Sequence, residues 1–83
     1  MISFCDEAWE DYQYWVANDR ARLKRIHALI KDIRRSSFEG IGKPEPLMHG
    51  LSGYWSRRID EEHRLVYTVR DDQVIIVQCR YHY

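Results

Sequence analysis

Apolar residues recur at helical spacing through the first third of the chain. The first set is Ala8, Trp9, Tyr12, Trp15 and Val16. This spacing predicts a helix with Asp6 as its N-cap that runs to about Ala17. The second set is Leu23, Ile26, Ile30 and Ile33. It predicts a second helix, capped at the break formed by Asn18 and Asp19, and the tight connection predicts an αα-hairpin.

The second half of the chain carries three β-rich segments, at residues 54–59, 63–69 and 74–80. Short polar turns separate them, so we expect antiparallel hairpins. A further short strand at residues 2–5 precedes the helices. The order β-α-α-β-β-β predicts an α+β fold, in which two helices pack on a mostly antiparallel sheet. The last segment begins with apolar residues on both faces, so we expect it inside the sheet.

Residues 36–46 form the one long connection, and they are rich in turn residues. Glu45 lies there between Pro44 and Pro46. Because the two prolines restrict the backbone, they present the Glu45 carboxylate on a stiffened segment. A solvated loop glutamate is the alternative interpretation.

The chain ends in Arg80-Tyr81-His82-Tyr83, directly after an apolar segment. Chain ends are usually loose and polar. A rigid strand could instead hold the terminal imidazole in place, with Tyr81 in the core. The alternative is an edge strand with a frayed polar end.

Composition and charge narrow the range of possible functions. A length of 83 residues predicts one domain, residues 1–83, and 45% hydrophobic with 31% charged residues is typical of a globular protein. Cys5 and Cys79 form no disulfide framework, and neither a leader nor an apolar run of membrane-spanning length is found. We therefore expect a cytoplasmic protein with both thiols in its core. The net charge of zero argues against non-specific nucleic-acid binding, although it does not exclude a local basic face.

Candidate chemistry is limited to acids and bases. The histidines and cysteines show no metal-ligand spacing, and the serines lie in no nucleophile motif, so we expect neither metal nor cofactor. Glu45, Arg64 and His82 are the residue types that move protons around a phosphodiester. The alternative for Arg64 is an ordinary cross-strand ion pair. For Arg57 and Arg58 the alternative is a solvated strand face.

Four stretches carry a family resemblance. They are Phe38-Glu-Gly-Ile-Gly-Lys-Pro-Glu-Pro-Leu47, Leu51-Ser-Gly-Tyr-Trp-Ser-Arg-Arg-Ile59, Glu61-Glu-His-Arg-Leu-Val-Tyr67 and Cys79-Arg-Tyr-His-Tyr83. With them, the chain resembles the YoeB toxins of the RelE/ParE superfamily of bacterial toxin–antitoxin ribonucleases, nearly from end to end. The resemblance implies a microbial RNase-like fold, a homodimer, and cleavage of messenger RNA in the ribosomal A site.

The same resemblance implies four catalytic roles. Glu45 matches the general base for the ribose 2′-hydroxyl, and Arg64 matches the residue that stabilises charge on the scissile phosphate. His82 matches the general acid for the leaving 5′-oxygen. Tyr83 matches the final tyrosine that orients the site.

Two further residues are expected to bind RNA, namely Lys43 and Arg58, of which Arg58 matches a phosphate-contacting arginine. Met48 stands where close relatives carry a lysine, so we expect weaker RNA contact rather than lost chemistry.

The implied partners are messenger RNA on the ribosome and a YefM/Phd-type antitoxin, with operator DNA contacted only through that antitoxin and no membrane. Two other functions remain open. ParE-like relatives inhibit DNA gyrase, and a catalytically inactive protein could serve as an antitoxin-bound corepressor. Neither would need Glu45 together with the His82-Tyr83 ending.

Overall fold

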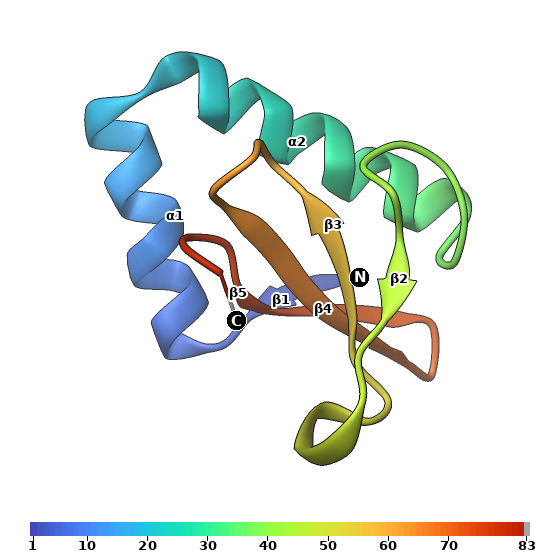
Figure 1. The fold of residues 1–83 in the computed structure, drawn as a ribbon. Coiled ribbons are helices and arrows are strands. Elements are labelled where there is room, and N and C mark those ends of the chain that lie inside the picture. The colour runs from blue at the N-terminus through green and yellow to red at the C-terminus, as the bar shows by residue number, and fades with distance from the viewer. Residues whose placement is uncertain (83) are drawn as a thin grey trace.

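The computed structural model describes residues 1–82. Its elements are β1 (Ile2–Phe4), α1 (Asp6–Asn18), α2 (Arg20–Arg35), β2 (Glu45–Pro46), the 3-10 helix η1 (His49–Leu51), β3 (Trp55–Arg58), β4 (Arg64–Arg70) and β5 (Gln73–Gln78). The strands form one sheet in the order β1-β5-β4-β3-β2. Strand β1 runs parallel to β5, and the other neighbouring pairs are antiparallel. The helical hairpin packs beside the twisted sheet (Figure 1). The predicted α+β fold is confirmed, and β5 lies inside the sheet.

The two helices begin differently. Asp19 caps α2, because its carboxylate accepts a hydrogen bond of 3.0 Å from the backbone N–H of Arg22. Cys5 precedes α1 and makes no side-chain cap. Asp6 is the first residue of α1, so its predicted N-cap role is wrong. It lies with Glu7 in the first turn, where acidic side chains interact favourably with the helix dipole. Neither helix of the described chain is long and apolar enough to cross a membrane.

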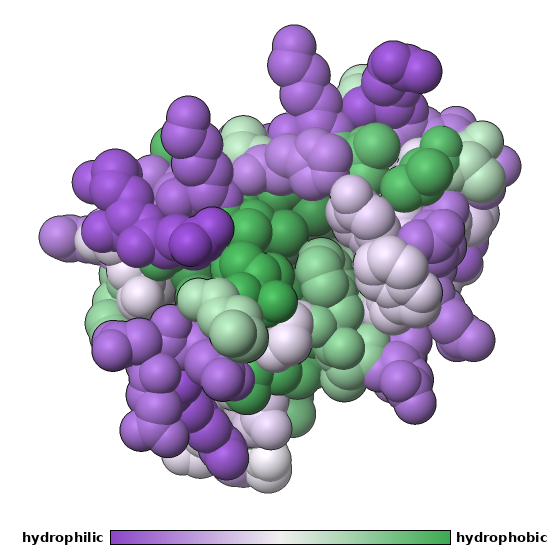
Figure 2. Space-filling view, turned by 180° about the vertical axis from the view of Figure 1, so that it is seen from behind, coloured by the Kyte–Doolittle hydropathy of each residue, from purple (hydrophilic) through white to green (hydrophobic). Residues whose placement is uncertain are grey.

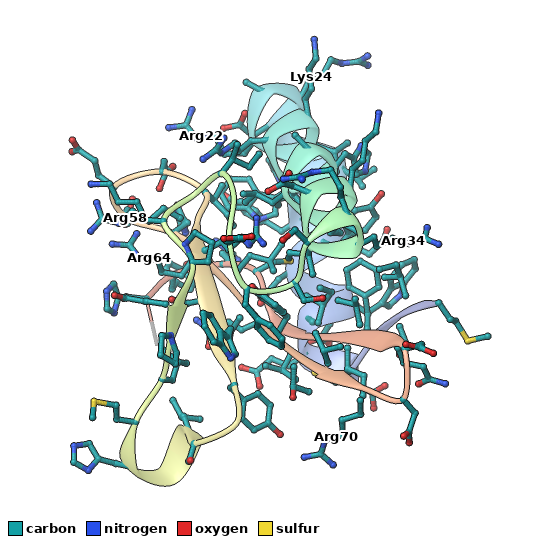
Figure 3. All side chains as sticks on the ribbon, turned by 90° about the vertical axis from the view of Figure 1, so that its right-hand side faces the viewer. Arg22, Lys24, Arg34, Arg58, Arg64 and Arg70 are labelled. Atoms are coloured by element: carbon teal, nitrogen blue, oxygen red, sulfur yellow. The ribbon has the colours of Figure 1, made fainter. Side chains whose placement is uncertain are left out.

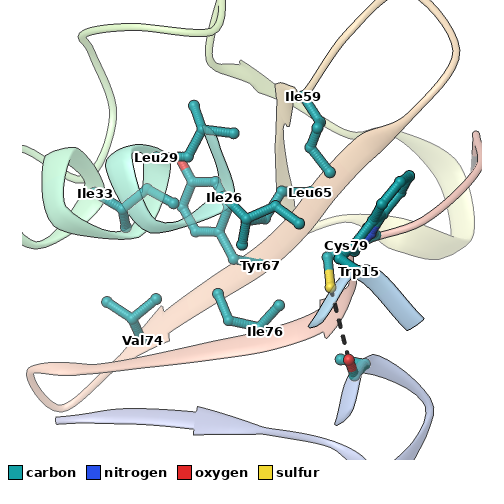
Figure 4. Close-up of a cluster of buried hydrophobic side chains, with 11 residues drawn as sticks. Trp15, Ile26, Leu29, Ile33, Ile59, Leu65, Tyr67, Val74, Ile76 and Cys79 are labelled. Atoms are coloured by element: carbon teal, nitrogen blue, oxygen red, sulfur yellow. Dashed lines mark hydrogen bonds between the residues drawn. The ribbon is translucent and has the colours of Figure 1, made fainter. Parts of the chain in front are cut away.

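The main core lies between α2 and one face of the sheet. Ile26, Leu29 and Ile33 are fully buried along one side of α2. They belong to the same cluster as Leu65 and Tyr67 of β4 (Figure 4). The apolar spacing read in the sequence therefore marks the face of α2 that contacts the sheet.

Helix α1 closes the other end of this core. The indole Nε1–H of the buried Trp15 donates to the carbonyl of Cys79 at 2.7 Å. The Cys79 thiol is buried and donates to the carbonyl of Ala8 at 3.6 Å (Figure 4). Burial raises the pKa of the Cys79 thiol to about 12, so this thiol stays neutral at physiological pH. Cys79 is a core residue as expected, whereas Cys5 is only partly buried.

Arg57 is fully buried, which the sequence did not predict. Side chains alternate along a strand, and Arg57 pairs with the core residue Leu65, so its side chain faces the helices. It donates to Oδ2 of Asp32 at 2.6 Å and to the hydroxyl of Tyr67 at 3.2 Å. The interpretation of a solvated strand face is therefore wrong for Arg57. Arg58, the next residue, is exposed.

Backbone carbonyls complete the surroundings of the Arg57 guanidinium. Its Nη atoms donate to the carbonyl oxygens of Ser36, Glu39 and Ile41, at 2.7, 3.1 and 3.1 Å. Gly40 lies within this turn at a φ of +129°, and a Cβ there would collide with the Asp32 carboxylate. The segment after α2 thus folds around a buried cation, and only glycine fits at its tightest point.

The same segment ends in β2, a strand that the sequence did not predict. The backbone N–H of Arg58 donates to the carbonyl of Gly42 at 2.7 Å, and Glu45 pairs with Ser56. Residues 36–46 are therefore a connection that finishes as a two-residue edge strand. Its pairing with β3 places Glu45 at the border of the sheet.

Replacing Arg57 with methionine should lower the free energy of unfolding by about 3 kcal/mol or more, because a buried ion pair loses one partner. Arg58→Met is the matched control, since Arg58 is the exposed neighbour in the same strand, and it should change stability by no more than about 0.5 kcal/mol. Urea unfolding of the variants measures both values. Equal stability of the two variants would contradict a structural role for Arg57.

Asp32 should contribute to the pH dependence of stability. Hydrogen bonds from Arg35, the Ile41 backbone N–H and Arg57 lower the pKa of its carboxyl from 3.8 to about 2. Because the folded pKa is the lower one, the contribution is complete above the unfolded value and is lost as the pH falls from about 4 towards 2. Unfolding midpoints in this range should fall less steeply for Asp32→Asn than for the wild type. Parallel curves would show that the carboxylate is not held in this way.

Candidate active site

The sheet has a second face, turned away from the helices. Leu65 and Tyr67 point into the core, so the intervening Val66 and the preceding Arg64 point to the opposite side. Arg64 pairs with Arg58 of β3. Glu45 of β2 pairs with Ser56, two residues before Arg58, and so shares this side. We call the surface that carries Glu45, Arg58 and Arg64 the open face.

The strand register fixes how far apart these residues lie. Glu45 and Arg58 are one strand and two residues apart, so their Cα atoms are separated by about 8 Å. Glu45 and Arg64 are two strands and two residues apart, or about 12 Å. Arg58 and Arg64 lie side by side at one end of the sheet (Figure 3). Side chains of this length can meet on one phosphodiester placed between them.

Arg64 is held rigidly although it is the first residue of its strand. The residue is only 9% exposed, and its Nη1 donates to the carbonyls of Asp60, Glu61 and His63 at 2.8, 3.3 and 3.2 Å. Among residues 1–82, the side-chain hydrogen bonds of Arg64 all use this one nitrogen. The turn between β3 and β4 thus orients the guanidinium from one side and leaves it charged.

The end of the chain returns to the start of β4. After β5 the backbone turns, and the carbonyl of Tyr81 accepts a hydrogen bond of 2.9 Å from the backbone N–H of Arg64. His82 is the next residue and is exposed. The structure therefore holds the backbone that leads into His82 against Arg64, a proximity that the sequence could not establish. Tyr83, the fourth predicted catalytic residue, lies outside the described residues.

The sequence had led us to expect Tyr81 in the core, and this prediction is wrong. Its side chain is 53% exposed, and its φ of +64° turns the chain out of the strand direction. It is surrounded by His63, to which the sequence gave no role, and by Arg80, which the sequence named only as part of the terminal motif. Tyr81 N–H donates to Nδ1 of His63 at 2.6 Å, and the Arg80 guanidinium lies 4.5 Å from the Tyr81 ring centre and 3.4 Å from that of Tyr14. The signal in the sequence was that His63 adjoins Arg64 and Arg80 adjoins Tyr81 within two of the stretches that carry the family resemblance.

The two residues expected to bind RNA are both exposed. Lys43 follows Gly42 in the segment that leads to β2, and Arg58 ends β3. A hollow of about 360 Å³ lies next to Glu45, with Met48 and Leu51 in its lining. Met48 is 73% exposed there. Within residues 1–82, no group of three or more acidic, histidine or cysteine side chains could hold a metal ion.

The chain is similar to a well-defined group of toxins. A family model described as "YoeB-like toxin of bacterial type II toxin-antitoxin system" matches residues 4–83. Toxin YoeB of Escherichia coli strain K12 is 63% identical over 82 residues, which cover 99% of this chain and 98% of that relative. Toxin YoeB of Streptomyces coelicolor is 61% identical with the same coverage.

Solved structures agree with this similarity. A YoeB/ParE toxin from Agrobacterium tumefaciens superimposes with a TM-score of 0.97 at 42% identity, covering 99% of this chain and 98% of that one. YoeB from Staphylococcus aureus is known in a heterotetrameric complex with YefM, at a TM-score of 0.94 and 52% identity over 100% and 97% of the two chains. The same toxin is known as a dimer, at a TM-score of 0.92 and 53% identity over 99% and 95%.

Proposed function

Because the chain belongs to the YoeB-like toxin family of bacterial type II toxin–antitoxin systems, we propose that it is an endoribonuclease that cuts messenger RNA in the ribosomal A site. One observation carries the chemical part of this proposal. The open face holds Glu45 and two directly paired arginines, Arg58 and Arg64, and the backbone leads His82 to the same end. Like charges that face each other across two strands are destabilising on their own. An anion bound between them would relieve the repulsion, and an RNA phosphate is such an anion.

The reaction that fits these residues is attack by the ribose 2′-hydroxyl on the adjacent phosphorus. Glu45 removes the proton of the 2′-hydroxyl, and the bond from the 2′-oxygen to phosphorus forms. The bond from phosphorus to the 5′-oxygen breaks, and His82 donates a proton to the leaving oxygen. The product is a 2′,3′-cyclic phosphate, and no metal ion is needed. DNA lacks the nucleophile, so the activity would be restricted to RNA.

The arrangement of the strands supports these roles. In-line displacement needs the base and the acid on opposite sides of the phosphorus. Arg64 lies on β4, between β5, which leads to His82, and the edge strand β2, which carries Glu45. The carbonyls that hold the Arg64 guanidinium orient it before substrate binds, and such preorganised charge is an effective way to stabilise a developing anion. Tyr83 would complete the site, and Lys43 and Arg58 would bind neighbouring phosphates.

The implied partners follow from the relatives. We propose that the chain forms a homodimer and binds a YefM/Phd-type antitoxin, through which alone it would contact operator DNA. Trp9 is half exposed, stacks on Tyr12 and meets Phe4 edge-on. A hollowed apolar patch framed by hydrophilic residues lies on the side shown in Figure 2. Exposed apolar patches of this kind are typical of interaction sites. The zero net charge suits a cytoplasmic enzyme whose RNA is held by the ribosome.

Glu45→Ala and His82→Ala should each lower cleavage of a translated message by about 10²- to 10⁴-fold, the usual contribution of a general base or acid. Both residues are exposed, so the fold should persist. Glu39→Ala and His27→Ala are matched controls, because they remove the same groups from exposed positions away from the open face. Mapping the cut sites with and without ribosomes provides the measurement. Growth arrest by all forms without RNA cleavage would favour a non-catalytic binding module.

The complex with the cognate antitoxin should cleave far more slowly than the free toxin. A segment of the antitoxin that orders on binding would cover the open face and displace the end that carries His82. Cleavage rates at equal toxin concentration, before and after proteolysis of the antitoxin, test this expectation. If the intact complex cut message as fast as free toxin, this mode of neutralisation would be excluded.

A further inference from the structure

Hydrogen bonds to the backbone of Tyr81 fix the segment that carries His82. The N–H of Tyr81 donates to Nδ1 of His63 at 2.6 Å, and the carbonyl of Tyr81 accepts from the N–H of Arg64 at 2.9 Å. A longer contact of 3.5 Å joins Gln78 Nε2 to the same carbonyl. Both polar groups of the Tyr81 backbone are thus fixed by consecutive residues, at the start of β4.

Tyr81 needs such support because of its conformation. Its φ of +64° lies in the left-handed region, which residues other than glycine occupy rarely. A backbone of this kind persists only where its surroundings hold it. His82 is one peptide bond further on, so the orientation of the Tyr81 backbone determines the direction in which the chain presents His82.

The His63 ring is itself well fixed. It is 8% exposed and packs edge-on against Trp15, with ring centres 4.9 Å apart and planes at 87°. On its other side it contacts the ring of Tyr81, at 5.5 Å. The Nε2 atom lies 3.4 Å from the Glu62 carboxylate. The turn supports the backbone as well, since His63 N–H donates to Asp60 Oδ1 at 2.7 Å.

These contacts select one tautomer of the neutral imidazole. A nitrogen that accepts a hydrogen bond cannot carry a proton, so Nδ1 is bare. The proton of the neutral ring is then on Nε2, on the side of Glu62. The His63 ring therefore accepts a specific hydrogen bond through Nδ1, in addition to packing under the end of the chain.

We propose that His63 is a positioning residue of the active site, which sets the place of His82 by accepting the hydrogen bond of Tyr81 through Nδ1. This inference rests on the proposed function, because it assigns His63 a role in the acid step. His63 does not touch the RNA. It acts on the rate through the peptide between Tyr81 and His82, while Arg64, its neighbour, acts on the phosphate.

Two substitutions of His63 distinguish the effect of its hydrogen-bond acceptor from the effect of its packing. His63→Asn places a carbonyl oxygen near the position of Nδ1 but loses most of the ring. His63→Leu keeps more apolar contact with Trp15 but removes the acceptor. If the acceptor matters, kcat for message cleavage should fall by about 10²-fold in His63→Leu, as expected for a misplaced catalytic group, with KM little changed. His63→Asn should retain most of kcat. His27→Leu controls for the loss of an exposed imidazole.

A second measurement does not depend on cleavage, and its wild-type part does not depend on the folding of a variant. In the wild-type toxin the backbone N–H of Tyr81 should exchange with solvent at least about 10-fold more slowly than an exposed amide, because it donates a hydrogen bond. His63→Leu should abolish this protection and His63→Asn should keep it.

Each outcome decides between the two proposals. Fast exchange of the Tyr81 amide in the folded wild type, or equal kcat values for His63→Leu and His63→Asn, would overturn the positioning role. A wild-type toxin that protects this amide but cuts no RNA would leave the His63 contact in place and refute the proposed nuclease function instead.

Discussion

The arrangement of this small molecule depends on the burial of one cation. The Arg57 guanidinium lies inside the protein between α2 and the sheet, where an unpaired charge would cost several kcal/mol. A carboxylate, a phenol and backbone carbonyls satisfy it, and the carbonyls belong to the segment that follows α2. That segment is obliged to fold over the arginine. Its continuation then pairs with β3 as β2, which positions Glu45.

The division of the sheet into two faces follows from the same strand. Arg57 and Arg58 are adjacent, so one points to the core and the other to the open face. On the core side the positive charge is neutralised by Asp32. On the open face, Arg58 faces Arg64 across the strands, so two positive charges lie close together there. Proteins tolerate such local repulsion where function needs it, and a phosphate ligand would remove it.

The other end of the active site is built from the turn before β4 and the turn after β5. Residues 60–63 orient the Arg64 side chain through their carbonyls, while His63 and the Arg64 backbone hold Tyr81. Trp15 of α1 supports this corner from beneath, through its contacts with His63 and Cys79. The general acid proposed for the reaction therefore lies on a segment without regular structure, but that segment is tied to the most buried strand.

The sequence alone determined the helices, the β-rich segments and the α+β class, because these follow from local periodicity and turn residues. Asp19, for example, is recognisable as a cap from its position between two periodic segments. The sequence motifs also identified the family. Only the tertiary structure decided which of two neighbouring arginines is buried, because both have the same charge and the choice depends on pairing with Leu65. The exposure of Tyr81 and the approach of His82 to Arg64 were likewise invisible, since a positive φ and a register between distant strands leave no periodic signal.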